Sequence, residues 1–318
     1  MKMTITDPKK YLRSCDVQNL PVTYDDCEEY EVFGHKIKVY NDMWMHHLHL
    51  KVTDKCNAAC EFCIEQGCAI NEDADTYLSN LEKVLAEMSR ANLLFSVSVT
   101  GGEPTLFKKF PELCNLLSRY RQNIGFLTMN TNGFWVRKYL KYIDGLFDFI
   151  NISRHSVSDS RNNEIFHTYV LNKRELEGLK SKLRSTKMRI QCVMSEVVTI
   201  EDMKEFIEAY SFADDISFRR LMEVGDEFGL DYSVDKDHYN ECLEYAFRNW
   251  KFKEQTIQDY YVYEIYNTGS TDVTFSYSNM KMLREVEKSE SEDFYREFIL
   301  HPNGTLSGSW MKDNKVLL

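Results

Sequence analysis

The feature that most restricts the fold of this chain is an alternation, from about residue 47 onward, of short β-rich runs with longer amphipathic stretches. Parallel strands need a long crossover, usually a helix, so the alternation predicts a parallel sheet built from βα units. We expect strands at 47–53, 94–100, 125–130, 147–153, 187–194 and 214–220. We expect helices at 74–91, 108–121, 134–144, 161–184, 200–211 and 236–250.

Most of these strands are apolar on one face and polar on the other, because successive side chains point to opposite faces. In the first strand, Leu48 and Leu50 alternate with His49 and Lys51. A closed eight-stranded barrel would fill its interior with branched apolar side chains. Six strands with a polar inner face instead favour a partial (β/α)6 TIM-like barrel that holds a polar ligand. The alternative is an open sheet with one solvated face, which fits poorly with helices that cover both faces.

Extensions flank the predicted barrel at both ends. No internal repeat, low-complexity run or Gly/Pro-rich linker divides the 318-residue chain, which is long enough to bury a full core. We therefore predict one main α/β domain with a short N-terminal extension and a C-terminal β-hairpin extension that covers the barrel mouth. The predicted boundaries are 1–46, 47–250 and 251–318.

Composition and charge narrow the setting and the partners. No stretch approaches the roughly 20 apolar residues of a membrane helix, and the N-terminus lacks the apolar core of a signal peptide. We therefore expect a cytoplasmic protein with no membrane partner. The net charge is −11 with the acidic residues scattered along the chain, so a nucleic acid partner is not expected either.

Four of the nine cysteines crowd together after the first predicted strand, at Cys56, Cys60, Cys63 and Cys68. In a chain without an export signal, such a cluster favours metal binding over a disulfide framework. The first three have C-x3-C-x2-C spacing. Three thiolates on one loop can hold three irons of a four-iron cubane and leave the fourth iron open. The spacing alone is also compatible with a zinc site.

A second motif, Gly101-Gly102-Glu103-Pro104, follows the second predicted strand, one βα unit after the cysteine loop. Glycines let the backbone approach a bound group closely, and a carboxylate or carbonyl can accept a hydrogen bond from an amino group. Such a turn alone is unspecific. Together with the cysteine loop at this separation, it makes the chain resemble the radical S-adenosylmethionine (radical SAM) superfamily over roughly 47–220.

The resemblance implies a single [4Fe–4S] cluster on Cys56, Cys60 and Cys63, with S-adenosylmethionine bound to the open iron. One electron, from a carrier such as flavodoxin or ferredoxin, would split this cofactor to a 5′-deoxyadenosyl radical that abstracts hydrogen from a substrate. Cys68 could close the cluster as a fourth ligand, but we expect the open site. The residues that match cofactor-binding positions of the family are Phe62, Gly101, Gly102, Glu103, Asn132, Ser153, Arg154 and Val193.

We predict no auxiliary cluster. The region 255–318 has the pattern of two β-hairpins, and the second, which contains an Asn303-Gly304 turn, resembles the first hairpin of the SPASM extension. In that extension a cysteine follows the turn, whereas here no cysteine lies beyond Cys242. By strand parity Cys192 faces the helices, so we expect a buried structural thiol there rather than a hydrogen donor.

The substrate is less constrained than the cofactors. The inner strand parity gathers five basic residues, and no acid is noted among the inner positions: His47, His49, Lys51, Arg189 and Arg219. This favours an anionic group such as a carboxylate, an acidic peptide segment or a phosphate. The hairpin resemblance favours a peptide or small natural product as the substrate. We therefore expect a role in natural product biosynthesis. The predicted substrate-binding residues are His49, Lys51, Asn130, Arg189 and Arg219.

Two alternatives stay open. The run Ser153-x-His-Ser156, followed by Asn162 and Ile165, resembles the spacing after the fourth strand in viperin-like enzymes, which modify nucleotides. A non-catalytic iron–sulfur carrier or sensor is the third possibility. Cofactor cleavage by the reduced protein would separate that possibility from both enzymes.

Overall fold

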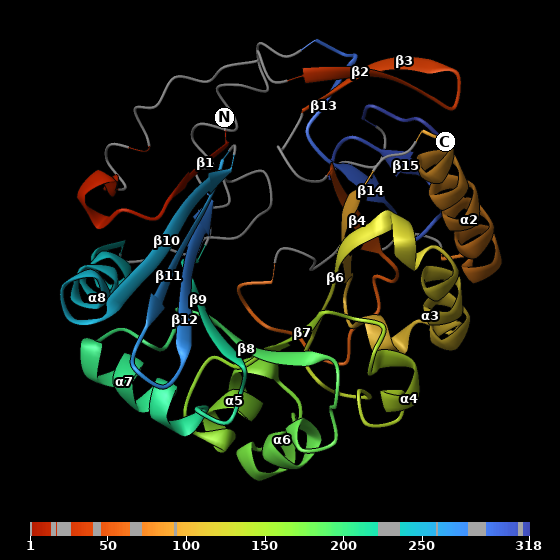
Figure 1. Ribbon diagram of the computed structural model, residues 1–318. Coiled ribbons are helices and arrows are strands. Elements are labelled where there is room, and N and C mark those ends of the chain that lie inside the picture. The colour runs from red at the N-terminus through yellow and green to blue at the C-terminus, as the bar shows by residue number, and fades with distance from the viewer. Residues whose placement is uncertain are drawn as a thin grey trace.

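All six predicted strands lie next to one another in one twelve-stranded sheet of the computed structural model (Figure 1). The structure describes residues 2–13, 17, 27–40, 46–63, 72–91, 94–221, 236–258, 260–278, 291–310 and 314–318. The six strands pair in parallel and in chain order. They are β4 (His46–Lys51), β5 (Phe95–Thr100), β6 (Ile124–Thr131), β7 (Phe149–Ser153), β8 (Lys187–Val193) and β9 (Asp215–Arg219).

Helices cover the outer face of this sheet from α2 round to α8, as expected for a partial TIM-like barrel (Figure 1). Short 3-10 helices lie at η1 (Pro8–Lys10), η2 (Pro104–Leu106) and η3 (Arg121–Asn123). The α-helices are α2 (Ala74–Arg90), α3 (Phe110–Arg119), α4 (Leu140–Ile143), α5 (Asp159–Phe166), α6 (Lys173–Lys180), α7 (Ile200–Ala209) and α8 (Lys236–Asn249). Among the helices so described, none is long and apolar enough to span a membrane.

Two helix predictions are wrong in detail. The helix expected at 161–184 is two helices, because His167 adopts the left-handed conformation (φ 52°) and ends α5. Asn172 then starts α6 with a capping box, in which its side chain accepts from the N–H of Glu175 and the Glu175 carboxylate accepts from the N–H of Asn172. The helix expected at 134–144 is reduced to the single turn α4, preceded by tight turns from Gly133 onward.

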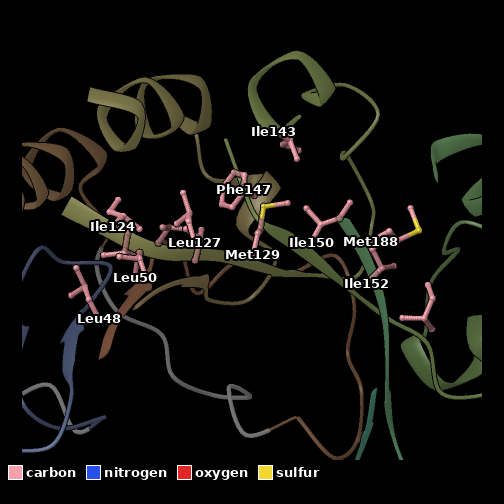
Figure 2. Packing of buried hydrophobic residues seen from close by; sticks show 14 of the residues in the cluster. Leu48, Leu50, Ile124, Leu127, Met129, Ile143, Phe147, Ile150, Ile152 and Met188 are labelled. Atoms are coloured by element: carbon pink, nitrogen blue, oxygen red, sulfur yellow. The ribbon is translucent and has the colours of Figure 1, made fainter. Parts of the chain in front are cut away.

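The apolar face of the strands points at the helices, as the alternation predicted. Figure 2 shows Leu48 and Leu50 of β4 on the same side of the sheet as Met129 and Ile152, under α4 and its neighbours. These four side chains have no solvent exposure. Each contributes about 1.5–3 kcal/mol by burial. The polar residues in between, such as His49, therefore face the barrel interior.

The sequence predicted two C-terminal hairpins but not that they extend the sheet. The C-terminal region adds strands to both edges of the six-stranded sheet. The first predicted hairpin is present and its second strand pairs in parallel with β9. The second hairpin is also present and its first strand pairs in parallel with β4. Both edges therefore gain hydrogen-bonded neighbours. The strands added by the C-terminal region are β10 (Lys251–Gln258), β11 (Tyr261–Asn267), β12 (Asp272–Ser278), β14 (Phe298–Leu300) and β15 (Leu306–Ser307). The N-terminal strand β1 (Lys2–Ile5) pairs with β10 at one edge.

A separate three-stranded sheet lies beyond β14 in Figure 1. It consists of β13 (Phe294–Tyr295), β3 (His35–Tyr40) and β2 (Cys27–Val32). The N-terminal and C-terminal regions therefore share this sheet as well as the edge pair of β1 with β10. The division of the chain into three parts, with the last covering the barrel mouth, stays a prediction.

Candidate functional site

The cysteine loop starts where β4 ends and carries the three motif thiols in different environments. Cys60 is buried, Cys63 is half-buried and Cys56 is exposed. Burial, followed by the neighbouring Cys63 and Cys56, raises the pKa of Cys60 to about 12. Three thiolates held together repel one another, and a bound cationic metal centre relieves this cost. The donor set therefore fits an iron–sulfur cluster. Cys68 lies outside the described residues.

Among the described residues, no three His, Cys, Asp or Glu side chains converge closely enough to hold a single metal ion. In a cubane each thiolate binds a different iron, so the sulfur atoms stand further apart than around one zinc.

Glu72 anchors the first residues of the cysteine loop, and no sequence motif had pointed to it. Its carboxylate accepts from the Thr53 hydroxyl and, at 2.8 Å, from the N–H of Asp54. It also pairs with Lys55 at 2.9 Å. Burial alone would raise the pKa of Glu72, but these donors hold it below its ordinary value. The three residues that lead into Cys56 are therefore fixed from one side.

The glycine-rich turn fixes the same residues from the other side. Gly102 N–H donates to the Thr53 carbonyl at 2.7 Å, and Glu103 N–H donates to the Lys55 carbonyl at 2.8 Å. A Cβ on Gly101 would lie 2.3 Å from the Thr53 oxygen, and one on Gly102 would lie 2.4 Å from the Lys55 oxygen. The two glycines are thus required by the contact between the turn and the cysteine loop. Their contact with the cofactor stays a prediction.

Glu103 joins the turn after β5 to the end of β6. Its carboxylate has no solvent exposure and accepts four hydrogen bonds, from the N–H and hydroxyl of Thr105, the hydroxyl of Thr131 and the N–H of Asn132. The last three are between 2.6 and 2.8 Å long. Burial raises the pKa of Glu103 even so. In this structure its oxygens bind the protein itself, and a cofactor contact stays a prediction.

Asn132 reaches from the end of β6 to the cysteine loop. Its Nδ2 donates to Asn57 Oδ1 at 2.8 Å and lies 3.9 Å from Cys56 Sγ. This places Asn132, a predicted cofactor-binding residue, beside Cys56, a predicted cluster ligand.

Arg154, predicted to meet the cofactor, lies fully buried behind these strand ends. Its terminal nitrogens donate to the backbone carbonyls of Ser153, Asn132 and Leu171. Burial lowers its pKa to about 10. The guanidinium thus holds together the ends of β6 and β7 and the segment before α6. Its predicted role toward the cofactor is untested, as is that of Ser153.

His155 links two predicted cofactor residues and was absent from the sequence-based site. Its Nδ1 accepts from the N–H of Val193 at 3.1 Å, and its ring packs edge-on against Phe62 with centroids 5.0 Å apart. The His155 ring also stacks on Phe166, with centroids 5.1 Å apart. Burial, followed by the charge of Arg154, lowers the pKa of His155 to about 3, so the ring is neutral. His155 is the histidine of the run Ser153-x-His-Ser156, but nothing in the sequence assigned it a role in the site.

Asn162 has a structural explanation in this fold. Its Oδ1 accepts from the N–H groups of His155 and Ser156, and its Nδ2 donates to the carbonyls of Ser156 and Ser158. All four hydrogen bonds hold the loop between β7 and α5. The viperin-like spacing of this segment therefore coincides with a loop brace.

The predicted substrate residues lie on strands β4, β6, β8 and β9, at inner-face positions, with acids among their neighbours. Asn130 bridges its neighbours, donating to Ser98 at 3.1 Å and accepting from Asn151 at 2.9 Å. Arg219 lies opposite Val193 and Ser276 in the sheet register.

The interpretation of an inner face without acids is wrong. His49 Nε2 lies 2.9 Å from the carboxylate of Glu297, and Lys51 lies 2.9 Å from that of Asp54. Arg189 forms an ion pair with Asp215 on the adjacent strand. Asp215 shares the strand parity of Ser217 and Arg219, so the sequence could have revealed it.

Glu297 contacts residues from distant parts of the chain. Besides His49 it accepts from Trp310 Nε1 at 2.9 Å and from the Tyr260 hydroxyl at 3.4 Å. Trp310 also packs against the His49 ring, with centroids 5.0 Å apart. The C-terminal hairpin thus contacts the barrel interior through Glu297 and Trp310.

A partial barrel whose first strand leads into three cysteines, braced by a glycine-rich turn after the second strand, defines the class of barrel proteins that hold an iron–sulfur cluster at the strand ends. Residues 50–213 match the family described as the Radical SAM superfamily, which is more than half of the chain. The chain belongs to the radical SAM superfamily, and its cofactors are those of the family, a [4Fe–4S] cluster and S-adenosylmethionine.

Curated relatives share part of the chain. A probable GTP 3′,8-cyclase of Sulfolobus acidocaldarius is 31% identical over 189 residues, which cover 56% of this chain and 56% of the relative. The GTP 3′,8-cyclase of Shewanella denitrificans is 28% identical over 188 residues, covering 57% of this chain and 54% of the relative. The chain thus spans about half the length of the curated relatives it matches.

Solved structures agree on the fold. Streptococcus suis SuiB bound to S-adenosylmethionine has a TM-score of 0.60 and 15% identity, covering 84% of this chain and 60% of SuiB. A histidine-tagged anSMEcpe with bound AdoMet has a TM-score of 0.53 and 18% identity, covering 86% of this chain and 76% of anSMEcpe. These similarities confirm the predicted partial barrel. The likeness of the second hairpin to a SPASM extension stays a prediction.

Proposed function

We propose that this chain is a radical SAM enzyme that abstracts hydrogen from a polar peptide or small natural product. Cys56, Cys60 and Cys63 would hold the cluster, which together with S-adenosylmethionine would supply a 5′-deoxyadenosyl radical for that abstraction. The protein residues around them orient the ligands and exclude water. We place the enzyme in the cytoplasm, supplied with electrons by a flavodoxin or ferredoxin.

The chain's own contribution begins with rigidity. Glu72 and the glycine-rich turn hold the loop before Cys56 from two sides, and Glu103 ties the turn to Asn132. Phe62 and Val193 are held by the same neutral imidazole of His155. A site preorganised in this way keeps the reacting groups in one geometry.

The observation that carries the substrate class is the pairing of charges on the inner face. His49, Lys51 and Arg189 each contact a carboxylate of the protein. A triphosphate needs several cations that are free to neutralise it, whereas paired charges present a polar surface with little net charge. The paired lining therefore favours a substrate with amide, hydroxyl or single carboxylate groups over a nucleotide.

A nucleotide is the second candidate, because the curated relatives named above are GTP 3′,8-cyclases. The region shared with them covers little more than half of either chain. The Streptococcus suis SuiB structure, in contrast, was solved with its precursor peptide SuiA. The two substrate classes are separable by experiment.

The test uses anaerobically reconstituted protein, reduced with dithionite and given S-adenosylmethionine. We expect 5′-deoxyadenosine to form, which would exclude a non-catalytic carrier or sensor. Adding GTP should neither increase its formation nor raise the melting temperature. Among peptide and small-molecule fractions of a cell extract, we expect one fraction to increase the formation of 5′-deoxyadenosine. A compound in that fraction should change in mass during the reaction. Stimulation by GTP with a new nucleotide product would overturn the peptide or natural-product assignment.

A further inference from the structure

Exposed aromatic and basic side chains occur on the segment between β6 and α4, on α4, and on the segment between α5 and α6. Figure 1 shows α4 outside the sheet. We call this surface the rim patch. Phe134, Trp135 and Tyr169 are among the exposed large hydrophobic residues, with exposed fractions of 37%, 36% and 55%. Phe134 and Trp135 stack with centroids 5.2 Å apart. The rim patch consists of Phe134, Trp135, Arg137, Lys138, Lys141 and Tyr169.

The rim patch is positive within an acidic protein. The chain carries a net charge of −11, yet residues 113–143 contain no Asp or Glu. Arg137, Lys138 and Lys141 are all exposed. Arg137 is paired with Glu175 at 3.3 Å, and Lys138 Nζ lies 4.1 Å from the Trp135 ring centroid. Lys138 and Lys141 thus add positive charge to a surface with partly exposed aromatic rings. Such a surface is complementary to an acidic surface of a partner protein.

Two short chains of contacts connect the rim patch to the cysteine loop. In the first, Phe134 N–H donates to Asn132 Oδ1 at 3.0 Å, and the amide nitrogen of the same side chain lies 3.9 Å from Cys56 Sγ. In the second, Val170, next to Tyr169, packs in one buried cluster with Cys60. The exposed rings are therefore only one or two residues removed from two cluster ligands.

We propose that the rim patch is the docking surface for an acidic one-electron carrier protein that reduces the cluster. This inference rests on the proposed function, since only a redox-active cluster needs such a partner. One electron passes from the reduced carrier to the cluster, so the carrier is oxidised by one electron and the cluster is reduced by one. Redox partners form small, short-lived complexes, so a limited docking surface is enough. The polar inner face, in contrast, is left to the substrate.

The test reverses two charges of the rim patch and compares two reductants. The variant is Lys138→Glu with Lys141→Glu. The matched control is Lys9→Glu with Lys10→Glu, two exposed lysines of η1, which follows the edge strand β1, whereas β6 lies seven strands away in the sheet order. A reduced acidic flavodoxin is one electron donor and dithionite, which needs no docking surface, is the other. Formation of 5′-deoxyadenosine is measured with each, and the affinity for oxidised flavodoxin is measured separately by calorimetry.

We expect the rim variant to bind flavodoxin at least about tenfold more weakly at low salt and to lose flavodoxin-driven turnover in proportion, while dithionite-driven turnover stays at the wild-type rate. Added salt should weaken the wild-type complex and change the variant little. Trp135→Ala should weaken binding without changing its salt dependence. Unchanged flavodoxin affinity in the rim variant, or equal loss in the control variant, would overturn the proposal. A wild-type protein that binds flavodoxin but forms no product with dithionite would instead contradict the proposed function.

Discussion

The side-chain nitrogen of Asn132 lies 3.9 Å from the sulfur of Cys56, across the gap between the end of β6 and the cysteine loop. The same nitrogen donates to Asn57 at 2.8 Å, so its position is fixed by the loop it contacts. N–H groups near cluster sulfurs stabilise the reduced, more negative state.

Asn132→Ala should therefore lower the reduction potential of the cluster. A contact of about 1 kcal/mol corresponds to a shift on the order of 40 mV for one electron. Potentiometric titration followed by electron paramagnetic resonance measures it, with iron content as the control. A potential unchanged in a fully loaded variant would show that Asn132 does not act on the cluster.

Gly102→Ala should disrupt the cysteine loop. The added Cβ would meet the carbonyl oxygen of Lys55 at 2.4 Å and that of Asp54 at 2.8 Å, and neither is a flexible side chain. We expect a loss of more than about 3 kcal/mol of stability or most of the cluster. Gly178→Ala in α6 is the matched control, because its Cβ meets nothing within 4 Å and should be neutral or stabilising by up to about 1 kcal/mol. Equal behaviour of the two variants in iron content and urea unfolding would contradict this account.

His155 should make the protein sensitive to acid. Its pKa is lowered to about 3 in the folded state, so below the ordinary value of 6.5 the unfolded chain binds a proton that the folded chain does not. Its contribution to stability is therefore lost as the pH falls from 6.5 toward 3, by about 1.4 kcal/mol per pH unit. His155→Asn keeps an acceptor for Val193 N–H but does not titrate. Urea unfolding at about pH 7 and about pH 5 should show a smaller decrease for the variant, and parallel decreases would exclude His155 as the cause.

Arg189 and Asp215 should be coupled in stability. Arg189→Met leaves the mostly buried Asp215 carboxylate without its cation, and we expect a loss of about 2–3 kcal/mol, reduced from the fully buried case because the arginine is partly exposed. Asp215→Asn in addition should restore part of it. A double-mutant cycle by urea unfolding measures the coupling. Additive losses would mean that the pair contributes nothing, and a folded Met variant with impaired substrate turnover would restore the predicted substrate contact.

The sequence predicted the sheet well because strand parity is a local property. Leu48 and Leu50 face the helices as expected, and His49 and Lys51 face inward. Asp215 belonged to the same pattern and was overlooked. The break between α5 and α6 depends on His167, a non-glycine residue whose backbone is in the left-handed conformation. No glycine or proline at this position indicated the break in the sequence. The Asn172 capping box was readable from the sequence.

The contacts that complete the site come from residues far apart in the chain. Glu297 meets His49 across 248 positions, and β12 and β14 extend opposite edges of the sheet. Neither relation leaves a periodic pattern, because each depends on how the C-terminal region folds back onto the barrel. Glu72 was missed for a related reason, since a single carboxylate upstream of a helix carries no motif.

The central claim is that three thiolates hold a cluster with one iron open to S-adenosylmethionine, and electron paramagnetic resonance of the reduced protein tests it most directly. Spectra are recorded before and after S-adenosylmethionine is added, for the wild type, Cys68→Ala and Cys60→Ala. We predict about four irons and a spectrum that changes with the cofactor in the wild type and in Cys68→Ala, and no cluster signal in Cys60→Ala. A wild-type spectrum that does not respond to S-adenosylmethionine, or loss of the cluster in Cys68→Ala, would contradict the account.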